Sequence, residues 1–158
     1  MNSLTLCLLA AAFALSTSTA SFADARYSPI EDKTVNSECG ACHLAFPPQM
    51  LPQRSWQKMM SNLKDHFNED ASVNEENQLY ITRFLMNGAA DTGLWNSRFM
   101  RGVKDHMTPQ RITELPYWQH EHRGEVPETA WNDPKVKSKS NCMACHPRAD
   151  QGKYDDDD

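Results

Sequence analysis

The sequence predicts a mostly α-helical protein. Apolar residues recur at helical spacing in several stretches, and Ser, Pro and Gly stand where helices usually begin or end. No stretch alternates apolar and polar residues as a half-buried strand would. The 158 residues are enough for one domain or for two small lobes.

The first expected helix covers residues 55–67, with Ser55 as its N-cap. Its apolar face is formed by Trp56, Met59, Met60, Leu63 and Phe67. A helix of this length would place His66 at the edge of the same face.

The next expected helix opens with Ser72-Val73-Asn74-Glu75, which has the spacing of a capping box, and ends at Asn87-Gly88. Its apolar residues are Leu79, Tyr80, Phe84 and Leu85. The small and polar residues 89–93 that follow mark the expected boundary between two lobes.

Three shorter segments are expected after that boundary. Trp95, Phe99 and Val103 indicate a short helix. Pro116 is suited to the first position of another, and Pro127 to the start of a short turn leading to Trp131.

The N-terminus has the features of an export signal. Residues 4–15 are apolar and uncharged but too few to span a bilayer, and small and hydroxylated residues follow them. An uncleaved buried helix is the alternative. We expect residues 1–23 to be a cleaved signal peptide and the mature protein to be periplasmic, with no membrane span.

The net charge of the chain is -5, from 16 Lys and Arg and 21 Asp and Glu. This balance argues against a nucleic-acid binder, which would normally present a basic face. Residues 155–158 are all Asp, so we expect an acidic tail on a body that is nearly neutral.

Two Cys-x-x-Cys-His motifs dominate the chemistry of the chain. They are Cys39-Gly40-Ala41-Cys42-His43 and Cys142-Met143-Ala144-Cys145-His146. In this motif two thiols on one turn add to the two vinyl groups of a haem, and the adjacent His becomes the proximal ligand of the iron. Cys7 would leave with the signal peptide, so the motifs use every cysteine of the mature chain. The sequence therefore predicts two covalently bound haem c groups.

Three other uses of these cysteines fit less well. A redox dithiol needs no following His and normally occurs once, in an αβ setting. The gap between Cys39 and Cys142 is far longer than compact zinc modules use. Paired disulfides are usual for an exported chain, but they would not explain the two following His residues.

The distal ligand of the first haem is expected to be His66, from its place on the apolar helix face. Met59 and Met86 are the rivals, because thioether sulfur also binds haem iron.

For the second haem, His122 is favoured over His106 and His120. His122 follows Trp118 by four residues and shares a helix face with Leu115, whereas His120 would point away. His106 stays open as a ligand because it follows Phe99 and Val103 at nearly helical spacing.

These observations predict a small two-lobed dihaem protein with one covalent haem per lobe. The N-terminal haem lobe covers residues 24–92, the C-terminal haem lobe residues 93–154, and the acidic tail residues 155–158. The first motif opens its lobe and the second closes its lobe.

Two groups of residues resemble the bacterial dihaem cytochrome c family. The N-terminal group is residues 39–48, then Ser55-Trp56, then the stretch from Leu63 through His66 to Ser72. The C-terminal group is residues 111–114, then Trp118 and Glu121-His122, then residues 141–146 and the Asp-rich end.

The resemblance implies two haem groups with bis-His ligation, His43 with His66 and His146 with His122. It also implies that the protein donates electrons to a small oxygen-binding class I cytochrome c, often with a membrane b-type cytochrome upstream.

An electron carrier is therefore the expected function, rather than an enzyme. The alternatives are a small haem enzyme or sensor with one open coordination site, such as a peroxidase, and the electron-transfer subunit of a periplasmic reductase. The first needs a five-coordinate haem, and the chain has enough His and Met to fill both sites.

Overall fold

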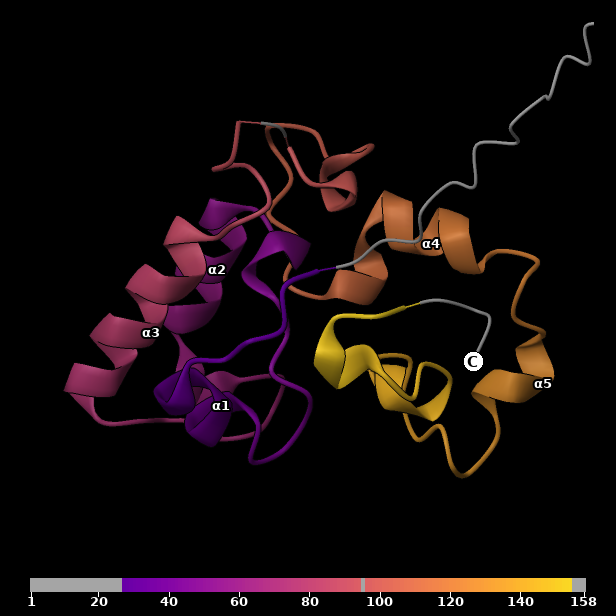
Figure 1. Ribbon diagram of the computed structural model, residues 1–158, viewed down its shortest axis with the longest axis horizontal. Helices are drawn as coiled ribbons and strands as arrows, with labels where there is room; N and C mark the ends of the chain where they lie inside the picture. Colours follow the sequence, from indigo (N-terminus) through magenta and orange to yellow (C-terminus); the bar gives the residue numbers. More distant parts are fainter. Residues whose placement is uncertain (1–26, 95, 155–158) are drawn as a thin grey trace, which may run out of the picture.

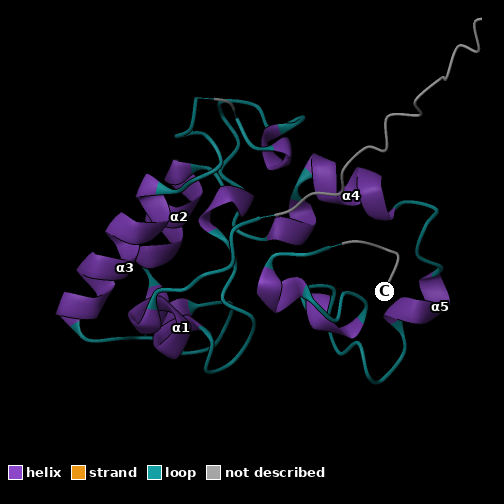
Figure 2. Ribbon diagram, viewed as in Figure 1, coloured by secondary structure: helices purple, strands orange, loops and turns teal. Residues whose placement is uncertain are grey.

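In residues 27–94 and 96–154, which the computed structural model describes, every regular element is an α-helix or a short 3-10 turn. Helices α1, α2 and α3 gather at one side of the molecule, and α4, α5 and the C-terminal segment at the other (Figure 1). The described residues contain no strand, only an isolated bridge between His66 and Glu69 (Figure 2). The predicted mostly α-helical fold is confirmed.

Helix α1, Lys33–Cys39, carries the first cysteine of the first motif on its last residue. The Asp32 carboxylate caps it by accepting a hydrogen bond from the Val35 backbone N–H at 2.9 Å. Val35 is buried and fixes the helix to the core. The periodicity of apolar residues did not reveal this helix, because so short a helix contributes one buried side chain.

Helix α2, Gln53–Met60, is shorter than the expected helix over residues 55–67. It begins after Pro52, so Ser55 is a buried residue inside the helix and not its cap. The chain leaves the helix at Ser61, and Asn62 adopts φ −143°, outside the helical region. The prediction that His66 lies on this helix is therefore wrong.

Helix α3, Glu75–Asn87, ends at Gly88 as predicted. Its cap is Asn74 rather than Ser72, since the Asn74 side chain accepts a hydrogen bond from the Asn77 N–H at 2.8 Å. Ile81 and Leu85 form its buried face, whereas the expected core residues Leu79 and Tyr80 are 54% and 44% exposed.

Two of the three predicted C-terminal segments are helices, α4, Pro116–His122, and α5, Glu128–Trp131. Pro116 takes the first helical position, and Pro127 is the N-cap of α5. The segment around Phe99 is only a 3-10 turn, because Gly102 has φ +78°, which a helix cannot contain. The 3-10 turns are Pro48–Met50, Leu63–Asp65, Arg98–Met100, Ile112–Glu114, Cys142–Ala144 and Ala149–Gln151.

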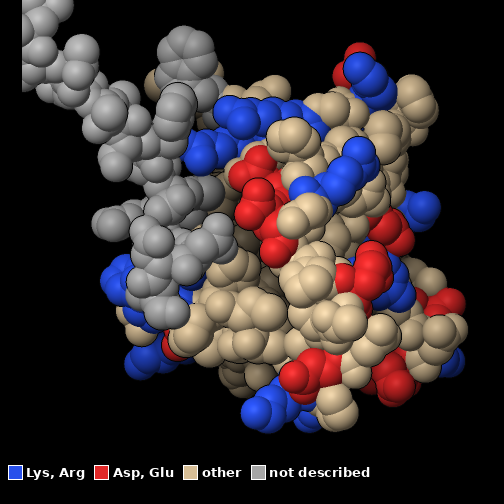
Figure 3. Space-filling view, turned by 90° about the vertical axis from the view of Figure 1, so that its right-hand side faces the viewer, with Lys and Arg blue, Asp and Glu red and all other residues tan. Residues whose placement is uncertain are grey.

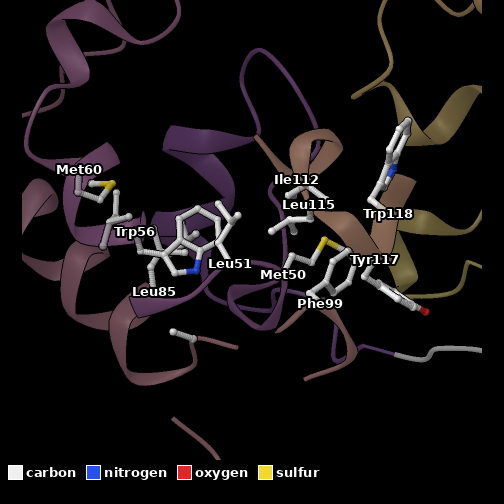
Figure 4. Close-up of a cluster of buried hydrophobic side chains, with 13 residues drawn as sticks. Met50, Leu51, Trp56, Met60, Leu85, Phe99, Ile112, Leu115, Tyr117 and Trp118 are labelled. Atoms are coloured by element: carbon white, nitrogen blue, oxygen red, sulfur yellow. The ribbon is translucent and has the colours of Figure 1, made fainter. Parts of the chain in front are cut away.

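The buried apolar side chains form one cluster that runs through both sides of the molecule (Figure 4). Trp56, Met60 and Leu85 lie at one end and Trp118 at the other, with Leu115 fully buried between them. The loops around this cluster are held by their own contacts. The Trp56 indole N–H donates to the Pro48 carbonyl at 2.8 Å, for example.

The first and last described segments are tied to each other. The Tyr27 N–H donates to the Gly152 carbonyl at 2.9 Å, and the Tyr27 ring packs on Phe99 and Tyr154. Gly152 has φ +72°, and a Cβ there would lie 1.7 Å from the Tyr27 carbonyl oxygen. Only glycine fits this contact.

The expected signal peptide, Trp95 and the acidic tail lie outside the described residues. Within those residues, none of the helices has the length and apolar character needed to cross a membrane. The division into lobes at residues 92 and 93 stays a prediction.

Candidate haem-binding sites

The first motif lies where α1 ends, and its proximal candidate faces the distal one. The ring centroids of His43 and His66 are 6.0 Å apart, with their planes at 19°. Two imidazoles that bind one metal ion through bonds of about 2 Å have centroids roughly 6 Å apart. The pair therefore has the separation that a six-coordinate iron requires.

His66 is held by a tight turn and not by a helix. The His66 N–H donates to the Glu69 carbonyl at 2.8 Å, and the Glu69 N–H donates back at 3.2 Å. The two residues between them, Phe67 and Asn68, have φ +57° and +74°, as a two-residue type I′ turn requires. The Arg111 guanidinium lies 3.8 Å from the centroid of the Phe67 ring, a cation–π contact that holds the turn.

A cavity of about 500 Å³ opens between these histidines. Its apolar wall comes from all three N-terminal helices and the loop before α2, through Val35, Leu51, Trp56, Met60, Ile81 and Leu85. Cys39, Cys42, His43 and His66 all line it. The apolar wall and the two facing histidines fit a covalently held porphyrin.

The protonation of the first pair also suits a metal. The His43 Nδ1 lies 2.7 Å from the Leu44 carbonyl oxygen. A carbonyl can only accept, so Nδ1 carries the proton and Nε2 keeps the electron pair that a metal needs. Burial, with smaller electrostatic effects of His43 and Arg111, lowers the pKa of His66 from its usual value, so His66 is neutral near pH 7.

The rivals of His66 differ in position. Met59 lines the same cavity, whereas Met86 is not among its lining residues. Neither replaces His66 in the face-to-face arrangement with His43.

The second motif occupies the 3-10 turn Cys142–Ala144 and the residues just after it. The rings of His146 and His122 are 6.3 Å apart, with their planes at 90°. This distance again matches two imidazoles on one iron. Burial raises the pKa of the Cys142 thiol to about 11.

Helix α4 orients His122. Its Nδ1 lies 2.8 Å from the Trp118 carbonyl oxygen, and its ring stacks on the Trp118 ring with centroids 4.0 Å apart. The carbonyl again assigns the proton to Nδ1. His120, on the other face of α4, and His106 are both exposed. The structure thus brings His122 to His146, on the buried face with Leu115 and Trp118.

The second site is surrounded by aromatic rings. Trp131 lies 6.1 Å from His122, and Tyr154 lies 5.7 Å from His146. The sequence indicated Phe67 only as an apolar helix residue and Arg111 only as part of the stretch 111–114, and it did not indicate Tyr154 at all. A search for aromatic and cationic side chains that follow the motifs would have found Tyr154, but only the folded chain places Arg111 over Phe67.

The two sites share a wall. Trp118, Ile112 and Cys142 line the cavity of the first site, although Trp118 stacks on His122 and Cys142 belongs to the second motif. A group bound in one site would therefore lie close to a group bound in the other.

All four described cysteines are unpaired. In the described part of the chain, His, Cys, Asp and Glu side chains do not gather in groups of three or more that could hold a metal ion by themselves.

Comparisons with known proteins agree with this arrangement. The family model described as "Dihaem cytochrome c" matches residues 35–154. A diheme cytochrome c from Rhodobacter sphaeroides is similar in structure, with 40% sequence identity, a TM-score of 0.75, and coverage of 79% of this chain and 98% of that one.

A diheme cytochrome type c from Shewanella baltica OS155 is 31% identical, with a TM-score of 0.64 and coverage of 78% of this chain and 86% of that one. No curated protein matches the chain.

Proposed function

The chain belongs to the dihaem cytochrome c family and has two haem c groups as cofactors, and from this premise we propose that it is a periplasmic electron carrier with two bis-His haems. The observation that carries the proposal is the pair of histidine separations, 6.0 Å and 6.3 Å, each beside a Cys-x-x-Cys-His motif. When bound, each haem supplies a one-electron Fe(III)/Fe(II) couple.

In this proposal Cys39 and Cys42 hold the first haem, and Cys142 and Cys145 hold the second. His43 and His66 would hold the iron of the first haem, and His146 and His122 would hold the iron of the second. With two histidines on each iron, the protein would leave no position for a substrate. Bis-His ligation gives a lower potential than His/Met ligation.

The surrounding residues keep the ligands fixed during electron transfer. The carbonyls of Leu44 and Trp118 hold the Nδ1 protons of His43 and His122, so Nε2 faces the metal in both oxidation states. Apolar side chains of the cavity wall, such as Val35, Leu51 and Ile81, would cover part of the first haem. A fixed site requires little rearrangement when the charge of the iron changes.

Trp118 supports electron transfer between the two sites. Its ring contributes to the wall of the first cavity and stacks on His122 of the second site. The Cys142 thiol lies in the same wall. This short apolar separation suits direct transfer between the haems.

We propose a small c-type cytochrome as the electron acceptor and a membrane b-type cytochrome as a possible donor. This choice of partners is supported by the resemblance to the dihaem cytochrome c family, which is carried by residues 39–48, residues 111–114 and the second motif. The export signal predicted for residues 1–23 supports the periplasm as the compartment.

A haem enzyme or sensor is the competing function, and it would need one iron with an open position. The second alternative, an electron-transfer subunit of a periplasmic reductase, would use the same haem chemistry and would co-purify with a large catalytic chain.

Reduction under carbon monoxide tests the proposal. We expect two reversible one-electron couples in a potentiometric titration, no CO adduct on the reduced protein, and no turnover of hydrogen peroxide. A CO adduct on the wild-type protein, or rapid peroxide turnover, would identify an open haem and support the enzyme or sensor instead.

A further inference from the structure

Charge is divided unevenly between the two halves of the described chain. Residues 27–92 carry nine Asp and Glu against five Lys and Arg, whereas residues 93–154 carry seven against ten. The nearly neutral body expected from the whole-chain charge is thus a negative N-terminal half and a positive C-terminal half. A charged partner would be attracted to one half and repelled by the other.

The positive charge beside the second motif is concentrated in one loop, residues 132–141. Lys135, Lys137 and Lys139 are all exposed, and between the first two Val136 is buried and anchors the loop. The Asn141 side-chain amide donates to the Val136 carbonyl at 3.0 Å, which holds the loop from within. This loop, the lysine loop, therefore exposes the side chains of its three lysines to solvent while Val136 anchors it.

The tip of the loop has an unusual backbone conformation. Lys137 has φ +62°, in the left-handed region that favours glycine and asparagine. Residues in such conformations are found preferentially at functional sites. Among residues 27–94 and 96–154, none of the three lysines forms an ion pair.

The lysine loop lies against the second haem-binding site. The Lys139 ammonium is 5.2 Å from the centroid of the Trp131 ring, and that ring is 6.1 Å from His122. The loop runs directly into Cys142, whose Sγ lies 3.6 Å from the Ser140 carbonyl oxygen. A molecule bound to the loop would therefore lie close to the second haem.

An uncharged surface adjoins the lysines. Met143 is 39% exposed, and its neighbours Ala144 and Cys145 are exposed as well. Figure 3 views this end of the molecule, where Lys and Arg groups lie toward its upper and lower margins beside uncharged surface, with Asp and Glu between them. Exposed uncharged side chains next to charged ones are common in transient protein–protein interfaces.

We propose that the lysine loop and Met143 form the docking surface for an acidic redox protein, which makes the second haem the exit site for electrons. The proposal rests on the proposed electron-transfer function and adds the location and the charge of the partner. The exposed first motif does not serve an acidic partner, because Glu31, Asp32 and Glu38 precede it. A partner with a negative patch is steered away from that half and toward the loop.

The test measures oxidation of the fully reduced protein by two monohaem cytochromes c, one acidic and one basic, in a stopped-flow instrument at low ionic strength. The variant carries Lys135→Gln, Lys137→Gln and Lys139→Gln. Its matched control carries Lys33→Gln, Lys58→Gln and Lys104→Gln, which removes the same charge from exposed lysines elsewhere.

We expect the loop variant to react roughly tenfold more slowly with the acidic cytochrome, and the control variant to change about twofold or less. At about 1 M salt, where the screening length falls to roughly 3 Å, the wild-type protein and the loop variant should react with the acidic cytochrome at the same rate. Equal rates for the two variants, or no dependence on salt, would overturn the docking surface. If the wild-type protein reduces neither cytochrome, the proposed function itself fails.

The acidic tail is the other possible occupant of the lysine loop, so both variants are repeated in a chain with residues 155–158 changed to Asn. The proposal predicts that the loop variant is slower in both backgrounds. Slowing only when the aspartates are present would mean that the lysines neutralise the tail, and this result would also overturn the proposal.

Discussion

The two haem-binding regions begin from the same five-residue motif but build the opposite side of the haem differently. In the first, His66 stands in a tight turn over an apolar cavity, and its ring is nearly parallel to that of His43. In the second, His122 stands on helix α4 among aromatic rings, perpendicular to His146. The motif therefore determines where a haem is attached, whereas the segment that carries the second histidine determines how the two rings are oriented.

The largest expected effect comes from emptying the distal position of the first region. His66→Ala should let the reduced first haem bind CO while the second stays low-spin, because loss of the His66 imidazole would leave one position on the first iron without a protein ligand. Absorption spectra under CO would then show a CO adduct on one of the two haems. His106→Ala, at an exposed histidine, is the matched control and should bind no CO.

An unreactive His66→Ala protein would mean that another side chain fills the position. Met59 is then the first candidate, because it lines the same cavity.

The second region can be tested by changing its ligand type. His122→Met should raise one of the two potentials by on the order of 0.1 V, since axial ligands tune haem potentials over about 0.8 V. Potentiometry of the variant would show one shifted and one unshifted couple. His120→Met, on the exposed face of the same helix, should shift neither.

The contact that joins the two regions can be broken at Gly152. Gly152→Ala should lower the free energy of unfolding by about 2–4 kcal/mol, because the new methyl group meets the Tyr27 carbonyl and φ is positive. Gly124→Ala shares the positive φ but has nothing within 4 Å, so it should cost only about 1 kcal/mol. Urea denaturation of both variants measures the difference, and equal losses would contradict the clash.

The same junction should weaken at high pH. Burial raises the pKa of Tyr27 to about 12, above the value of about 10 expected in the unfolded chain. Its contribution to stability is complete below pH 10 and is lost as the pH rises toward 12. The urea midpoint of Tyr27→Phe should therefore fall less between pH 9 and pH 11.5 than that of the wild type. Identical falls would show that Tyr27 does not titrate in this range.

Local signals in the sequence predicted much of the fold. Pro116 and Pro127 stand at helix starts as predicted, because the proline ring fixes φ at a value that suits the first turn of a helix. Helix α3 also ends at Gly88 as predicted. The helix over residues 55–67 was predicted too long, because apolar spacing continues past Ser61 although the chain turns there. The spacing of apolar residues predicts which side chains face the core, and Leu63, although only partly buried, still packs against the core from a turn.

The sequence predicted some parts of the candidate site correctly and others only in part. The attachment motifs are contiguous, so the sequence displays them in full. His122 was placed from its spacing to Trp118 and Leu115 on one helix. His66 was named on a helix that ends before it, and its actual position depends on the turn through Phe67 and Asn68 and on Arg111 from a distant segment.

Both haems are proposed to lie between two histidines, and the two pairs of rings differ in orientation. An electron paramagnetic resonance spectrum of the fully oxidised protein tests both points at once. Imidazole planes at 19° predict a rhombic low-spin signal from the first haem, and planes at 90° predict a more anisotropic low-spin signal with a larger maximal g value from the second. We expect these two signals in equal amounts and no high-spin iron. A high-spin signal, or two identical rhombic signals, would contradict the account.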